Sequence, residues 1–87
     1  ENKKLEQVVM VSVGDARLIG FITRDNFIDL PQIGTDAEVA VYIPFSYQVG
    51  GYTCIMPKNS LQKVDMTVEE GMRFAITAGI IKKHEKK

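Results

Sequence analysis

The sequence has few of the residues from which catalytic and metal sites are most often built. Its 87 residues include one cysteine and one histidine. A single cysteine excludes an intramolecular disulfide and any metal site made from several thiolates. Cys54 stands between Thr53 and Ile55 in a strand-like run, and we expect it to be a small buried apolar side chain. His84 lies in a lysine-rich terminal segment, which argues against a catalytic base or a metal ligand.

Other chemical motifs are also missing. The glycines do not have the spacing of a phosphate-binding loop. The aspartates are spread along turns and strand ends without the pattern of a calcium loop. Glu69 and Glu70 are adjacent, so on a helix they point in different directions and do not form a carboxylate pair. We therefore expect a protein that is not an enzyme, with no catalytic residue, no metal and no cofactor.

The charges leave no basic surface for nucleic acid. Lysine plus arginine and aspartate plus glutamate are both 11, so the net charge is zero. The last six residues, KKHEKK (82–87), hold four of the lysines. The chain before them is therefore mildly acidic, which argues against binding to phosphates. We predict one soluble domain over residues 1–81 and a disordered, solvated tail over 82–87.

Long hydrophobic runs are absent as well. No apolar stretch approaches the ~20 residues that span a bilayer, and no secretory signal is visible. The chain begins ENKKLEQ and not with methionine, so we expect it to be a piece of a longer protein. The unpaired cysteine is typical of a reducing compartment.

What the sequence does contain is a series of strand-like segments. QVVMVSV (7–13) is β-branched and predicts a strand buried on both faces. GDAR (14–17) is typical of a tight turn, so 7–13 and 18–25 form a hairpin, with positive φ tolerated at Gly14 and Asp15. Gly20 inside the second strand indicates a bulge or a close backbone approach.

Further strands follow a connecting loop. The loop covers 26–37, and we expect Phe27, Ile28, Leu30 and Ile33 to tie it to the core. Strands are predicted at 38–44, at 52–57 and, briefly, at Val64. In the first of these, Val39, Val41 and Ile43 alternate onto one face.

A helix near the C-terminus has the clearest local pattern. Thr67 and Glu70 form a capping box, and Gly79 is a natural C-terminal stop. The apolar stripe is expected to comprise Val68, Met72, Ala75, Ile76 and Gly79. Gly71 weakens a helix, which suggests a close packing contact there. Phe74 falls off the stripe and marks either a partner surface or a broad buried face.

The segment PFSYQVGGYT (44–53) joins two predicted strands and permits two interpretations. As a hairpin connection, it obtains positive φ angles from its two glycines, and its tyrosines pack over the sheet. As a recognition loop, it presents exposed aromatic residues to a partner or ligand. The residues that we single out for such a contact are Pro44, Phe45, Ser46, Tyr47, Gly50, Gly51, Tyr52 and Phe74.

The order of several short motifs resembles one known family. GFIT (20–23), VAVYIP (39–44), GGY (50–52), CIMP (54–57), VDMTVEEG (64–71) and TAGI (77–80) are similar to the soluble region of the continuous-vascular-ring (COV)-like family. Here FSYQVGG replaces the proline-rich loop of that family. The resemblance implies an uncharacterised membrane protein whose anchor is absent from this chain. It also implies a bacterial inner membrane with this domain facing the cytoplasm, and no known cofactor.

Together these observations predict an α+β fold. We expect a small curved sheet or open barrel of four to five mostly antiparallel strands, with one C-terminal helix. The expected function is non-enzymatic interaction or assembly within an integral membrane protein. The partner would be the protein itself or another membrane-associated protein, and not nucleic acid. The alternative is a small-ligand sensor that uses the 44–53 loop.

Overall fold

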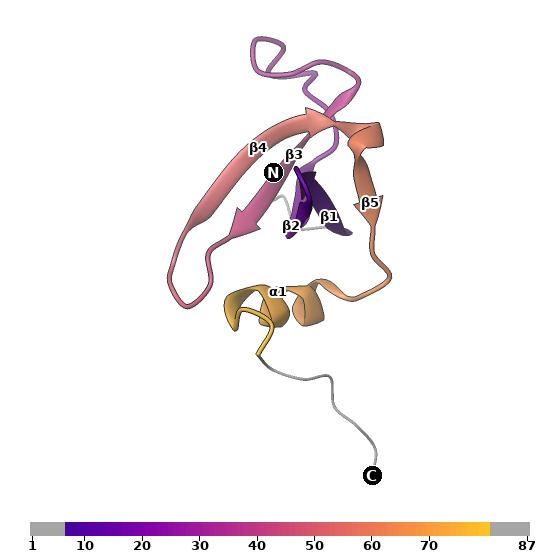
Figure 1. Ribbon diagram of the computed structural model, residues 1–87. Helices are drawn as coiled ribbons and strands as arrows, with labels where there is room; N and C mark the ends of the chain where they lie inside the picture. Colours follow the sequence, from indigo (N-terminus) through magenta and orange to yellow (C-terminus); the bar gives the residue numbers. More distant parts are fainter. Residues whose placement is uncertain (1–6, 81–87) are drawn as a thin grey trace.

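The computed structural model describes residues 7–80 and has the expected α+β architecture (Figure 1). Its elements are β1 (Gln7–Val13), β2 (Ala16–Arg24), β3 (Glu38–Pro44), β4 (Gly51–Pro57), the short 3-10 helix η1 (Lys58–Ser60), β5 (Leu61–Lys63) and α1 (Val68–Ile76). The strands form one sheet in the order β4-β3-β2-β1-β5, and every neighbouring pair is antiparallel. The predicted tail at 82–87 lies outside the described residues.

The β1–β2 hairpin is confirmed and has a two-residue turn. Val13 pairs with Ala16, so β2 begins two residues earlier than expected. Gly14 has a φ of 59°, and the next residue, Asp15, does not have a positive φ. A positive φ at the first central position alone is the pattern of a type II′ turn. Of the two residues expected to tolerate a positive φ, only Gly14 adopts one.

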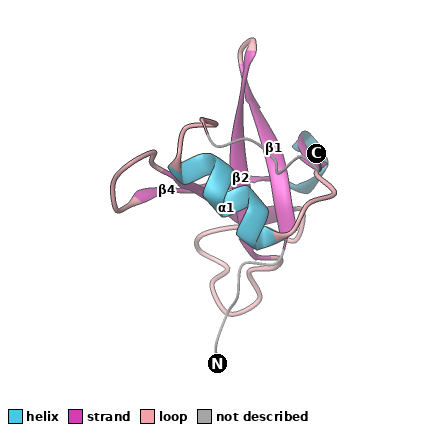
Figure 2. Ribbon diagram, turned by 90° about the horizontal axis from the view of Figure 1, so that it is seen from below, coloured by secondary structure: helices cyan, strands magenta, loops and turns pink. Residues whose placement is uncertain are grey.

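The two faces of the sheet are buried by different means. On the inner face of the curved sheet, one core cluster comprises Val9, Val11, Val39, Val41 and Ile43. On the opposite face, Val8 and Phe21 are directly paired and fully buried. The short helix α1 lies across this second face (Figure 2). Burial on both faces of β1 is thus confirmed for its first half, but Ser12 and Val13 at its end are exposed.

Gly20 marks a close approach of neighbouring side chains. A methyl group on its Cα would lie 2.7 Å from Cγ1 of Val41, because this side chain of the neighbouring strand β3 packs over Gly20. The irregularity in pairing lies further along, between Ile22 and Arg24. One extra residue in β2, Thr23, therefore forms the bulge, and Gly20 provides the space.

The helix begins as predicted and ends earlier than expected. Thr67 and Glu70 form the full capping box, and Gly71 makes the expected close contact. A methyl group there would lie 3.0 Å from both Phe21 and Val8. The helix ends at Ile76 and not at Gly79. Ile76 is 41% exposed, so the apolar stripe is not buried along its whole length. The buried helix residues are Gly71 and Ala75, which face the sheet.

The 26–37 loop and the short strand near Val64 both differ from expectation in detail. In the 26–37 loop Phe27 is buried, and its ring packs against Gly34. Ile28 and Ile33 are exposed, so the prediction that they anchor the loop was wrong. The short strand lies just before Val64, which continues it with one hydrogen bond from its backbone amide to the carbonyl of Val8.

Candidate interaction surface

The 45–50 segment is a hairpin connection between β3 and β4. Pro44 pairs with Gly51 at the end of the ladder. The backbone amide of Phe45 then donates to the carbonyl of Gly50 over 2.9 Å and closes the loop. The hairpin interpretation of this segment is therefore confirmed.

The two glycines of this loop serve different purposes. Gly50 has a φ of 110°, a conformation that side chains rarely adopt. Gly51 does not have a positive φ, contrary to our expectation. It is instead crowded by β3, since a methyl group on its Cα would lie 2.8 Å from the Cα of Pro44. Gly50 allows the return of the chain, and Gly51 allows the two strands to meet.

The loop is fastened to the C-terminal end of α1. The hydroxyl of Ser46 donates to the carbonyl of Ala75 over 2.9 Å. The backbone amide of Tyr47 donates to the carbonyl of Ile76 over 2.8 Å. The last carbonyls of a helix have no partner within the helix. The loop supplies partners for two of them, and this docking holds Tyr47 at a φ of 56°.

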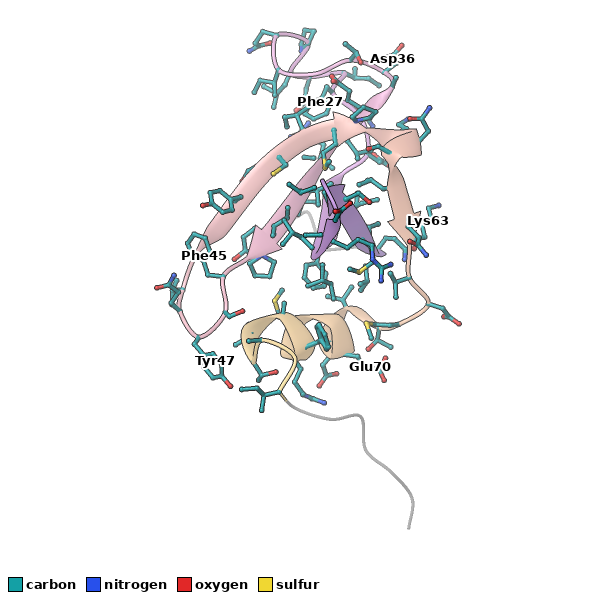
Figure 3. All side chains as sticks on the ribbon, in the orientation of Figure 1. Phe27, Asp36, Phe45, Tyr47, Lys63 and Glu70 are labelled. Atoms are coloured by element: carbon teal, nitrogen blue, oxygen red, sulfur yellow. The ribbon has the colours of Figure 1, made fainter. Side chains whose placement is uncertain are left out.

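The aromatic side chains of the hairpin divide into two groups. The rings of Phe45 and Tyr52 meet edge to face with centroids 5.3 Å apart, and the hydroxyl of Tyr42 donates to the carbonyl of Gly50. These contacts stiffen the hairpin from within. Tyr47 instead projects away from the sheet beside the end of α1 and is 65% exposed (Figure 3). The expectation that it packs over the sheet was wrong.

Docking of the loop brings exposed apolar residues to one end of the molecule. We call this region the end surface, and it comprises Tyr47, Val49, Phe74, Ile76 and Ile80. Val49 at the loop tip is 99% exposed and Phe74 is 47% exposed. The Phe74 ring lies over Gly79, in the turn that follows the helix. The interpretation of Phe74 as part of a broad buried face was therefore wrong.

The structure unites some of the predicted contact residues and separates others. Tyr47 and Phe74, which are distant in sequence, both contribute to the end surface. Ser46 and Gly50 shape the loop, and Pro44 is half-buried at the strand end. Val49, Ile76 and Ile80 were not predicted to take part: Val49 lies in the hairpin loop, and Ile76 and Ile80 lie at and beyond the end of α1.

Two shallow, open grooves lie near α1. One is lined by Gln7 and by residues 63–68. The other follows the outer side of the helix along Val68, Met72 and Ile76 and is mostly apolar. Within residues 7–80, no group of three or more potential metal ligands gathers. No helix in this described part is long and apolar enough to cross a membrane.

Comparison with known proteins relates the chain to one family. Residues 1–51 match the family model described as Protein of unknown function (DUF502). No curated protein and no solved structure matches the chain. The matched region runs through β1, β2 and β3 and the loop that docks on α1. Because the match covers more than half of its residues, this chain belongs to the DUF502 family.

Proposed function

We propose that this chain is a non-enzymatic interaction domain of an integral membrane protein. Its partner is a second copy of the protein or another membrane-associated protein. The anchor lies outside this chain, in a bacterial inner membrane, and the domain faces the cytoplasm. The resemblance to the COV-like family supports the membrane setting, and the end surface supports the interaction role.

The observation that carries the proposal is the fixed exposure of apolar side chains on the end surface. Exposed aromatic residues on a loop held by a rigid scaffold are typical of recognition sites. Here two hydrogen bonds to α1, from Ser46 and Tyr47, hold the loop. A partner would therefore meet a surface that is already ordered, which lowers the entropic cost of binding.

The charges around the end surface favour an apolar contact. The loop residues 45–50 carry no charge. The nearest charged pair on α1, Arg73 and Glu69, forms an exposed i,i+4 ion pair at 3.3 Å. Apolar and aromatic groups without isolated charges are typical of the centre of a protein interface.

The ligand-sensor alternative gains no support from the tyrosines of this hairpin. Such a sensor would enclose a ligand between Tyr42, Tyr47 and Tyr52. The Tyr42 hydroxyl is bonded within the hairpin, and Tyr47 and Tyr52 are both more than 60% exposed. The three side chains do not enclose a shared cavity, so we do not propose this function.

Site-specific photocrosslinking in the full-length protein, within its native membrane, tests the proposal. A photoreactive amino acid replaces Tyr47 or Phe74 in turn. The control position is Ile28, which is 80% exposed and lies in the 26–37 loop. We expect adducts at both test positions that contain either the same protein or an identified membrane protein. Adduct formation no greater than at Ile28 would refute the interaction role of the end surface.

Fractionation of the full-length protein tests the membrane setting separately. We expect it in the membrane pellet, and we expect it to remain there after washing with high salt and alkaline buffer. Recovery in the supernatant after either wash would refute an integral anchor. This result would leave the photocrosslinking outcome unaffected.

A further inference from the structure

The second surface of interest is the free edge of β4, whose hydrogen-bonding groups can be assigned. In an antiparallel ladder, directly opposed residues alternate between hydrogen-bonded and non-hydrogen-bonded pairs. The amide of Phe45 bonds to Gly50 at one end of the β3–β4 ladder, and the amide of Lys58 bonds to Ala37 at the other. Both bonds continue the β3–β4 register by one residue at each end. They identify Phe45–Gly50 and Ala37–Lys58 as hydrogen-bonded pairs, so every second pair between them is also hydrogen-bonded.

This alternation determines which groups of β4 point away from the sheet. Tyr52, Cys54 and Met56 direct their amides and carbonyls toward β3. Gly51 and Ile55, with Thr53 between them, direct theirs toward the free edge. Among residues 7–80, no hydrogen bond reaches these three outward amides and carbonyls. Beyond them, the carbonyl of Pro57 accepts from the Ser60 hydroxyl, and proline has no amide hydrogen.

The two edges of the sheet differ in how they are protected. Proteins often blunt an edge strand by making it short or by placing lysine on it. β5 has both features, since it has three residues and ends at Lys63. β4 has seven residues without a charged side chain, and its register with β3 is regular throughout. Only the β4 edge is therefore suited to pairing with another strand.

We propose that two copies of this domain pair through β4 in an antiparallel arrangement, with the two-fold axis at Thr53. This inference rests on the proposed interaction role and names a second copy as the partner at this edge. In this register Thr53 faces Thr53 of the second copy, and Gly51 faces its Ile55. All three outward amides of each copy then meet an outward carbonyl, so six hydrogen bonds form between the copies.

The symmetry and the side chains favour a second copy over an unrelated strand. A register centred on Cys54 would place Gly51 against Pro57, whose carbonyl is already occupied. The register centred on Thr53 leaves none of the free groups unused. Thr53 and Ile55 lie on the face of the sheet opposite the core cluster. In the proposed register, Ile55 lies beside Gly51 of the second copy on this face. No like charges meet, and threonine pairs across strands are favourable.

The contact is small, so we expect a weak dimer of the isolated domain. A single shared strand pair buries less than a standard interface, and dissociation at roughly micromolar to millimolar concentrations is typical of such contacts. A membrane anchor would raise the effective concentration of the copies and strengthen the pairing.

Cysteine crosslinking of the purified domain tests the register. In a Cys54→Ser background, Thr53→Cys places two thiols in a directly opposed pair, with Cα atoms about 5.5 Å apart, within disulfide range. The thiols give up two protons and two electrons to added diamide. The control is Ile55→Cys in the same background, where the two thiols are displaced by four residues, roughly 13 Å. We expect a disulfide dimer for Thr53→Cys alone.

Proline substitution tests the edge itself. Thr53→Pro removes an outward amide and leaves the bonds to β3 intact, because proline is tolerated at such positions of edge strands. The matched control is Lys63→Pro, which removes an outward amide from the opposite edge. By sedimentation equilibrium, we expect Thr53→Pro to raise the dissociation constant at least tenfold and Lys63→Pro to leave it unchanged. Thermal unfolding of each variant verifies that it folds.

Several outcomes would overturn the inference. These are a monomeric wild type at millimolar concentration, equal crosslinking of Thr53→Cys and Ile55→Cys, or a folded Thr53→Pro variant that still dimerises. Dimerisation that Tyr47→Ala abolishes while Thr53→Pro does not would also overturn it, but it would support the end surface. Conversely, the disulfide dimer together with failed photocrosslinking at Tyr47 and Phe74 would support the β4 pairing and refute the end surface.

Discussion

The backbone amide of Tyr47 donates a hydrogen bond to the carbonyl of Ile76 over 2.8 Å, so the tip of the β3–β4 hairpin is attached to the last turn of α1. The hairpin and the helix therefore support one another.

Ser46→Ala should loosen the docked loop. The substitution removes the half-buried bond from the hydroxyl to the carbonyl of Ala75, and the loss of such a bond costs about 1 kcal/mol of stability. We expect faster hydrogen exchange of the Tyr47 amide and a lower urea midpoint. Ser60→Ala removes a similar local bond at the other end of β4, and exchange at Tyr47 should not change. Unchanged exchange in Ser46→Ala would contradict the prediction.

Gly71→Ala should destabilise the protein even though alanine favours helices. The gain in helix propensity is about 1 kcal/mol. The added methyl would lie 3.0 Å from Val8 and Phe21, which are fully buried and cannot move aside easily. Overpacking of this kind costs about 1–3 kcal/mol, so we expect a net loss of up to about 2 kcal/mol in denaturant unfolding. A more stable variant would show that the sheet can shift.

Thr67→Ala should weaken the start of the helix. The Thr67 hydroxyl accepts from the amide of Glu70, and the Glu70 carboxylate accepts from the amide of Thr67, both over 3.0 Å. Loss of the cap costs about 1 kcal/mol, measured as a shift of the urea midpoint. Thr67→Ser keeps the hydroxyl and should retain most of the stability. Equal losses in the two variants would argue against the cap as the cause.

Ala78→Gly should stabilise the protein. Ala78 is exposed and has a φ of 56° after the end of α1, a conformation that costs a residue with a Cβ about 1 kcal/mol. Ala37 is also exposed but has no positive φ. Ala37→Gly should therefore be destabilising by about 0.5–1 kcal/mol through the entropy of the unfolded chain. Opposite shifts of the melting temperature would confirm the contrast.

Much of the fold could be predicted from the sequence because its signals are local. The capping box of Thr67 and Glu70 involves residues three apart, and the turn at Gly14 joins adjacent strands. Alternation in β3 and the missing side chain of Gly71 also pointed correctly to buried surfaces. Each of these patterns expresses a constraint within a few residues of chain.

The candidate contact surfaces depended on tertiary structure. Ser46 and Ala75 are 29 positions apart, and the docking of the loop on α1 places Tyr47 beside the end of the helix. The role of Gly51 follows from the proximity of β3, and the free edge of β4 follows from its place at the end of the strand order. Local sequence determines which segments become strands and helix. Exposure and the direction of backbone hydrogen bonds are decided by which distant segments become neighbours, and no local pattern encodes those neighbours.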